Sequence, residues 1–312
     1  MFGSVHCCSQ VLFREQREIL QHVKKIEKVF DFYKKSNELS QFSNQILMVA
    51  PSFGDPNNRR LTEDSLHEYS KIHQILIDND AKIYLFDQYV HEKSILGHFP
   101  SHFFSTHFSL KSEKSNLIFY PKKKEQKKER VISRLNSWYK DVTTIENDSL
   151  EGSGSIVFDR MNMIGYYAES EKTNSKLAEE TIVKLEYKPF KIHFSTNAFE
   201  KKFTNSSLFI GSSIAIVCQD SFTNGEDLIN NLKKTHKVIE ITQEQAIKFC
   251  ASIFEFGTEN KSNLVISTTS FDSFTKEQIE ILNEKSKILK VSAECLEKLT
   301  NFGIGNLFAP LF

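Results

Sequence analysis

The sequence is poor in cysteine, and the few cysteines that it has form no framework. Five occur among 312 residues: Cys7 and Cys8 are adjacent, whereas Cys218, Cys250 and Cys295 are widely spread. This spacing excludes a dense disulfide network and contains no C-x-x-C metal motif, and no lipidation signal lies beside Cys7 and Cys8. We therefore expect reduced cysteines, no metal and no other cofactor, in a cytoplasmic protein.

An excess of charge and a long apolar run are also lacking. The 40 basic and 40 acidic side chains leave zero formal charge, so no global field attracts nucleic acid or an anionic membrane. The basic run Lys122–Arg130 is interrupted by acids and has no interleaved aromatics, which favours the solvated start of a helix over Val131–Tyr139. No apolar run approaches the ~20 residues of a membrane span, and residues 1–10 do not resemble a signal peptide. We expect neither a nucleic-acid nor a membrane partner.

Residues 1–44 are predicted to form an amphipathic helical extension ahead of a domain over residues 45–312. After a first step of seven, its apolar positions recur at steps of four and three, at Leu12, Ile19, Val23, Ile26, Phe30 and Tyr33. The pattern spans roughly three heptads, the lower limit for a coiled coil. Two interpretations stay open: the helix packs on its own domain, or it joins the chain to a second copy or an active paralogue.

From Gln45 onward, short apolar runs alternate with helical segments, which is typical of an α/β fold. The expected strands are Ile46–Ala50, Ile83–Phe86, Leu117–Tyr120, Ile156–Phe158, Ile214–Cys218, Val238–Ile241, Leu264–Ser267 and Ile288–Val291. The expected helices are Glu63–Asp78, Lys176–Leu185, Glu226–Lys233, Gln243–Cys250, Thr275–Asn283, with Ser273 or Thr275 as N-cap, and Ala293–Leu299. Strand starts near Ile156, Leu208 and Leu264 are about fifty residues apart, which indicates about five repeated β/α modules.

Four segments combine glycine, small polar residues and acids at the ends of apolar runs, where α/β folds place their sites. They are the loop Phe99–His107, the turn and strand Leu150–Arg160, the segment Phe203–Cys218 and the C-terminal segment Phe302–Phe312. Two strings in them are the most specific: Glu-Gly-small-Gly-Ser, three apolar residues and Asp-Arg at Glu151–Arg160, and Thr-Asn followed by Gly at Thr204–Gly211.

The order and spacing of these segments, with the opening run Ile46–Pro51, resemble the pentein or guanidino-group modifying (amidinotransferase) superfamily. The resemblance covers Gln45–Phe312 and lies in the citrulline-hydrolase-like branch, related to arginine deiminases and dimethylarginine hydrolases. Phe249–Glu255 is a weaker match to a family segment whose Gly and Asn are replaced here. Membership implies a five-bladed α/β propeller of about five ββαβ modules, with a site at the centre.

The chemistry that this resemblance implies needs side chains that the sequence no longer has. Hydrolysis of a planar guanidinium or ureido carbon calls for a thiolate nucleophile, a histidine that moves protons, and carboxylates that hold the cationic end. The family's cysteine position corresponds to Asn306, and its histidine position, directly before Thr204, corresponds to Phe203. Neither an amide nor a phenyl ring can replace the lost group.

Other polar residues of the implied site remain and are expected to contact a small guanidino or ureido amino acid. They are Glu151, Asn205, and Ser101 with His102 where the family has asparagines, followed by Phe103 in place of a tryptophan. The alternative is that Glu151 caps a local turn and Asn205 satisfies backbone groups. Several of the 27 phenylalanines, among them Phe203 and Phe308, are expected to fill the former site.

No second active site is evident. His102, His107 or His193 could approach the centre, but no nucleophile accompanies them, because Cys218 ends a strand and Cys250 and Cys295 resemble small core residues in helices. The sequence therefore predicts a catalytically inactive superfamily member that serves as a binding or scaffolding module. The alternative is a hydrolase of guanidino or ureido C–N bonds with a relocated or non-covalent site, in which Glu151 and a histidine direct water.

Overall fold

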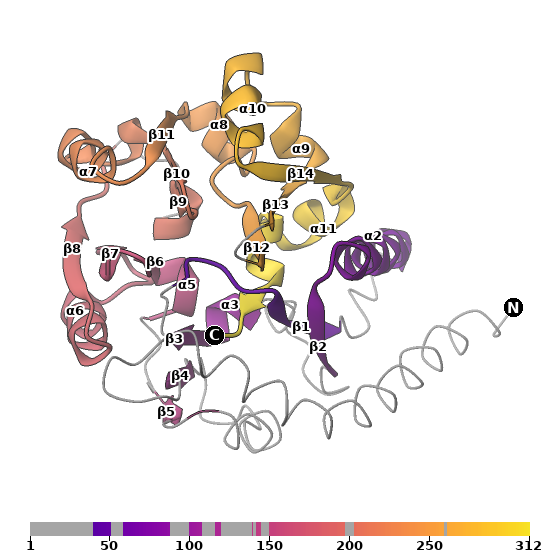
Figure 1. Ribbon diagram of the computed structural model, residues 1–312, viewed down its shortest axis with the longest axis horizontal. Helices are drawn as coiled ribbons and strands as arrows, with labels where there is room; N and C mark the ends of the chain where they lie inside the picture. Colours follow the sequence, from indigo (N-terminus) through magenta and orange to yellow (C-terminus); the bar gives the residue numbers. More distant parts are fainter. Residues whose placement is uncertain are drawn as a thin grey trace, which may run out of the picture. The chain divides into compact units, whose positions relative to one another are not determined.

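Figure 1 shows the computed structural model, which describes residues 40–50, 59–87, 100–107, 116–119, 139, 142–144, 150–196, 203–258 and 261–312. These residues belong to one unit over Ser40–Phe312. The predictions for the N-terminal helix, for Cys7 and Cys8, for the basic run and for the helix that follows it up to residue 138 lie outside the described residues. No helix within the described ranges is long and apolar enough to cross a membrane.

The described strands form five separate three-stranded sheets that share one pairing pattern. In each sheet the middle strand pairs antiparallel with one neighbour and parallel with the other. The sheets are β15 (Ala309–Pro310), β1 (Gln45–Ala50) and β2 (Lys82–Asp87); β3 (Phe104–His107), β4 (Asn116–Phe119) and β5 (Val142–Thr144); β6 (Ile156–Asp159), β7 (Ile164–Ala168) and β8 (Lys188–Ile192); β9 (Leu208–Ile210), β10 (Ile214–Val217) and β11 (Lys237–Glu240); and β12 (Phe254–Thr258), β13 (Lys261–Ser267) and β14 (Ser286–Val291).

Helices connect the parallel strands, because two parallel neighbours need a crossover. These are α2 (Arg59–Asp78), α6 (Ser175–Lys184), α7 (Gly225–Leu232), and α9 (Thr268–Phe271) with α10 (Lys276–Asn283). Two more, α8 (Gln243–Ile247) and α11 (Glu294–Thr300), follow the last strand of a sheet. Capping boxes open α8 at Thr242 and α10 at Thr275, which confirms the second of the two predicted caps.

Five single-turn elements complete the described part of the chain. Four of them lie between one sheet and the next along the chain: α3 (Pro100–Phe103), α5 (Gly152–Ser155), η2 (Thr204–Ser206) and η4 (Ile304–Leu307). The fifth, η3 (Gln219–Ser221), lies between β10 and β11 of the same sheet. At the start of the unit, the Gln41 amide donates to the carbonyls of Phe158 (2.8 Å) and Ile210 (2.9 Å). Gln41 thereby ties the segment ahead of β1 to β6 and β9.

The predicted alternation of strands and helices is confirmed, and each of the eight expected strands has a counterpart within a few residues. The fifty-residue repeat is also found, since the antiparallel outer strands begin at residues 104, 156, 208, 254 and 309. Leu264, however, lies in a middle strand, and the equivalent start is Phe254. A closed five-bladed arrangement does not follow from these five separate sheets alone.

Three local predictions were wrong. The loop expected over residues 99–107 contains α3 and β3, because its polar side chains find partners: the Thr106 hydroxyl donates to the Pro310 carbonyl at 2.8 Å. The helix expected up to Cys250 ends at Ile247, and Phe249 has a left-handed φ of 65°. Cys295 is only half-buried rather than a core residue.

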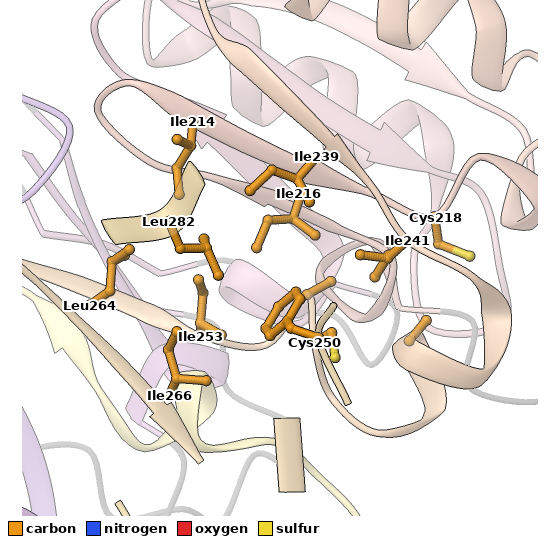
Figure 2. Close-up of a cluster of buried hydrophobic side chains, with 13 residues drawn as sticks. Ile214, Ile216, Cys218, Ile239, Ile241, Cys250, Ile253, Leu264, Ile266 and Leu282 are labelled. Carbon is orange, nitrogen blue, oxygen red and sulfur yellow. The ribbon is translucent and has the colours of Figure 1, made fainter. Parts of the chain in front are cut away.

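The core between the fourth and fifth sheets explains why β10 is apolar at every position. Ile214 and Ile216 point toward a cluster with Leu264 and Ile266 of β13 (Figure 2). The alternate residues of β10, Ala215 and Val217, belong to a second cluster with β7, β8 and α7. A strand buried on both faces loses the alternation of polar and apolar residues that marks a half-exposed strand.

Glu297 on α11 makes the stability of this fold dependent on pH. Burial raises its pKa to about 7, the nearby carboxylates of Glu68 and Glu294 act in the same direction, and the Ser267 and Thr269 hydroxyls partly oppose them. Because the folded state holds this proton more tightly than the unfolded state, stability falls as pH rises from about 4.5 through 7. Between pH 5 and pH 8 this one group costs about 2.5 kcal/mol.

Glu297→Gln is expected to remove that loss, because glutamine is neutral at every pH. Urea unfolding at pH 5 and pH 8 measures it, and the difference between the two free energies should shrink by about 2.5 kcal/mol relative to the wild type. Glu280→Gln, an exposed position on α10 that does not act on Glu297, is the matched control. An equal pH dependence in Glu297→Gln and the wild type would contradict the prediction.

Candidate functional site

Four short elements bring the predicted site residues together. Contacts join α3 to α5, α3 to η4, and α5 to η2; α3 and α5 lie side by side in Figure 1. The residues that meet here are Ser101 and His102 of α3, Glu151 before α5, Phe203 and Asn205 at η2, and Asn306 of η4. Sequence reasoning thus assigned the right segments to one place.

His102 lies between Glu151 and Asn306. Its Nε2 is 2.8 Å from Asn306 Oδ1, a residue 204 positions away, and its Nδ1 is 3.3 Å from Glu151 Oε2. The side chains of His102 and Glu151 are only 1% and 3% exposed. A buried imidazole therefore links a buried carboxylate to the side chain of Asn306.

The Asn306 side chain uses all four of its hydrogen-bonding capacities. Its Nδ2 donates to the Gly303 carbonyl at 3.0 Å and to Ser252 Oγ at 3.1 Å. Its Oδ1 accepts from Asn205 Nδ2 at 2.8 Å and faces His102 Nε2. An asparagine amide offers two donors and two acceptor sites, so the network saturates it. The Ser101 hydroxyl also donates to the Asn306 carbonyl at 2.9 Å.

The turn of α5 holds Glu151 in place through its backbone. The Glu151 carbonyl accepts from Gly154 N (2.8 Å) and Ser155 N (3.1 Å), and Glu151 N donates to Ser155 Oγ (2.8 Å). The side chain makes no capping hydrogen bond to the helix. The interpretation of Glu151 as a turn cap is therefore wrong. The interpretation of Asn205 as a partner of backbone groups is also wrong, because its amide Nδ2 donates to the Asn306 side chain.

Two phenylalanine rings pack against the imidazole. The ring centroids of Phe203 and Phe302 are 5.6 Å and 5.0 Å from that of His102, and 5.6 Å from each other. Phe203 is 7% exposed. Phe308, also expected here, instead packs its ring on Phe254 at 4.6 Å. Aromatic rings that surround a polar group exclude water and strengthen its electrostatic contacts.

The other candidate histidines do not join this cluster. His107 is buried beside Phe158, with Nε2 2.8 Å from Ser105 Oγ, and its pKa lies well below the usual value because of burial and the charge of Arg160. His193 is an exposed residue after β8. Of these three candidates, His102 is thus the one that reaches the site.

The cysteines supply no substitute nucleophile among the described residues. Burial raises the pKa of Cys250 to about 12 and also raises those of Cys218 and Cys295. A thiol with a raised pKa is a poor nucleophile at neutral pH, because the thiolate is the reactive form.

Sequence reasoning missed three contributors to the site: Ser252, Phe302 and the carbonyl of Gly303. Gly303 belongs to the glycine-containing C-terminal segment, and that was the available signal. An added Cβ at Gly303 would lie 2.5 Å from Ser252 Cβ, so the glycine permits the close approach of these two segments. Ser252 lies in Phe249–Glu255, the weaker match to a family segment, and that match was the available signal.

Comparison with known families and curated proteins shows what the sequence is similar to. The sequence model described as N,N dimethylarginine dimethylhydrolase, eukaryotic, matches residues 37–309. Direct comparison with curated protein sequences finds no match.

Several solved structures share the fold. ArgZ, an arginine dihydrolase from the ornithine–ammonia cycle in cyanobacteria, is 12% identical with a TM-score of 0.63, over 88% of this chain and 40% of that one. The N-terminal domain of ArgZ, bound to substrate, is 12% identical with a TM-score of 0.65, over 86% of this chain and 98% of that one. A dimethylarginine dimethylaminohydrolase, solved as an adduct with 4-chloro-2-hydroxymethylpyridine, is 13% identical with a TM-score of 0.61, over 86% of this chain and 100% of that one. The chain therefore spans about two fifths of full-length ArgZ, and at these identities the likeness shows the fold.

Proposed function

Because this chain belongs to the eukaryotic N,N-dimethylarginine dimethylhydrolase family of the pentein superfamily, we propose that it is a member without covalent hydrolase activity, retained as a binding or scaffolding module. The observation that supports the proposal is the state of Asn306. His102 Nε2 faces the side-chain amide of Asn306, and this amide is hydrogen-bonded through both its oxygen and its nitrogen.

The covalent route requires a group that can attack carbon. A thiolate would add to the guanidinium or ureido carbon, the amine would leave with a proton, and water would then release the enzyme. The lone pair of an amide nitrogen is delocalised, and both hydrogens of Asn306 Nδ2 are already committed to Ser252 and Gly303. Phe203 cannot move a proton. No step of that route can begin at these two positions.

The finer architecture and partners belong to the same proposal. The common pairing pattern, and a first sheet that takes β15 from the end of the chain, support five blades around a pseudo-fivefold axis. In that arrangement Ser101, His102, Glu151 and Asn205 border the central position where a small guanidino or ureido amino acid would bind. We further propose a cytoplasmic location and an N-terminal helix over residues 1–44 that joins a second copy or an active paralogue.

Turnover is the direct test of inactivity. Purified full-length protein is incubated with citrulline, arginine or methylated arginines, and the release of ammonia or methylamines is measured against a heat-denatured sample. We expect no release above that control. Release above it, retained on repurification and lost on Asn306→Leu, would overturn the proposal.

The contact between His102 and Glu151 favours one second candidate, a hydrolase that forms no covalent adduct. In such a reaction the attacking water loses one proton to the His102–Glu151 pair and the departing amine takes one from it. This candidate requires turnover by the wild type that Glu151→Gln abolishes. Turnover that persists in Glu151→Gln would exclude it.

A further inference from the structure

We propose that His102 has taken over the proton-handling position that Phe203 vacated, so that His102 and Glu151 form a working dyad aimed at the side chain of residue 306. The inference concerns the same site but does not depend on the absence of turnover in the wild type. It rests on where the hydrogens of this network must lie.

The Gly303 carbonyl determines the orientation of the Asn306 amide. A carbonyl oxygen only accepts, so the atom 3.0 Å from it must be the donor Nδ2. The other amide atom, Oδ1, then faces both His102 Nε2 and Asn205 Nδ2 at 2.8 Å. Since Oδ1 can only accept, His102 Nε2 carries a hydrogen.

That assignment leaves one proton between His102 and Glu151. If Nε2 is protonated on a neutral ring, Nδ1 presents a lone pair to Glu151 Oε2 at 3.3 Å, and a carboxylate there would repel it. The contact becomes favourable when the pair holds one more proton, as an imidazolium beside a carboxylate. His102 Nε2 then donates to Asn306 Oδ1, and the positively charged ring faces Glu151 Oε2 across the 3.3 Å ion-pair contact at Nδ1.

This is the arrangement that a general base reaches after it has accepted a proton from a nucleophile. A thiolate, like an amide oxygen, is an acceptor, so Asn306 Oδ1 occupies the role of a deprotonated nucleophile. A cysteine at position 306 would pass its proton from sulfur to His102 Nε2, leaving a thiolate beside an imidazolium. Glu151 would orient and stabilise that imidazolium through Nδ1.

The surroundings of His102 favour this state. Among the described residues whose contacts with the ring are known, Glu151 ahead of α5 is titratable, whereas Phe203 and Asn306 are not, and neither is Phe302 between α11 and η4. Burial alone would raise the pKa of a thiol, as at Cys250. The imidazolium is therefore the feature that would activate residue 306.

Full-length Asn306→Cys tests the dyad. The thiolate is titrated by its ultraviolet absorbance. The absorbance of Asn306→Ser, which keeps the five native cysteines but has no thiol at position 306, is subtracted, and iodoacetamide alkylation is mapped to residue 306 by mass spectrometry. In alkylation the sulfur displaces iodide and its proton goes to His102. We expect alkylation at pH 6.5 at least ~10-fold faster than in Asn306→Cys/His102→Gln, because an ordinary cysteine is only ~1% thiolate there.

A thiol that titrates like an ordinary cysteine, with or without His102, would overturn the inference. The wild type provides an independent test if the cysteine variant does not fold. Nitrogen-detected NMR of the histidine rings, with His102 assigned by its loss in His102→Gln, should show a protonated Nε2 at neutral pH. A bare Nε2 in the wild type would overturn the inference as well. Substrate turnover by the wild type would defeat the proposed function and leave this result unchanged.

Discussion

His102→Ala is expected to lower the free energy of unfolding by about 3–5 kcal/mol, although it changes one residue in a four-residue helix. Removal of one partner from a buried pair leaves the other charge uncompensated. Here the group that loses the imidazole contact is the Glu151 carboxylate, whose side chain is 3% exposed. The same change removes the ring that Phe203 and Phe302 cover.

Urea denaturation followed by circular dichroism measures this loss. His193→Ala, an exposed histidine of the same chain, is the matched control and should change stability by less than about 0.5 kcal/mol. The double variant His102→Ala/Glu151→Gln should be more stable than His102→Ala, because the buried carboxylate that loses the imidazole contact is replaced by a neutral amide. A single variant that loses less than about 1 kcal/mol would show that the two residues do not act as a buried charged pair.

Gly152→Ala is expected to lower the free energy of unfolding by at least about 3 kcal/mol and to move His102 away from Glu151. Gly152 has a φ of 40°, which side chains rarely adopt. A Cβ there would also lie 2.2 Å from the Ser101 carbonyl oxygen, a backbone atom that cannot turn away. Relief of this clash must push α3 from α5, and therefore His102 from Glu151.

Gly154→Ala, two residues further along the same turn, is the comparison. Its Cβ would meet the Phe203 ring at 3.1 Å and the His102 ring at 3.5 Å, both of them side chains that can shift. We expect a loss of about 1 kcal/mol. Thermal unfolding of both variants measures the difference, and equal losses would contradict the backbone argument.

The elements that the sequence predicts well are those whose own residues carry the signal. Thr275 and Gln278 form the capping box that opens α10, and the strong apolar runs became β1, β10 and β13. The strands that it missed draw their stability from neighbours. β3 has the sequence FSTH, which carries little apolar signal. It forms because it pairs with β4 and because its Thr106 hydroxyl bonds to the backbone of Pro310 and Phe312.

The site shows the same division. The sequence shows Phe at position 203 and Asn at position 306, where the family resemblance implies a histidine and a cysteine. The same resemblance implied that Ser101, His102, Glu151 and Asn205 belong together. It did not reveal which histidine, if any, would face Glu151, and it assigned His102 only to ligand contact.

The sequence by itself determined the family, the alternation of strands and helices, and the presence of Phe203 and Asn306 where the resemblance implies a histidine and a cysteine. Tertiary structure alone decided that His102 bridges Glu151 and Asn306, because that contact joins residues 204 positions apart and depends on the angle at which α3 meets α5 and η4. Local spacing determines which residues share a face of one element. The distance between two elements is determined by packing. Here it depends on the close approach of Gly152 to Ser101 and of Gly303 to Ser252.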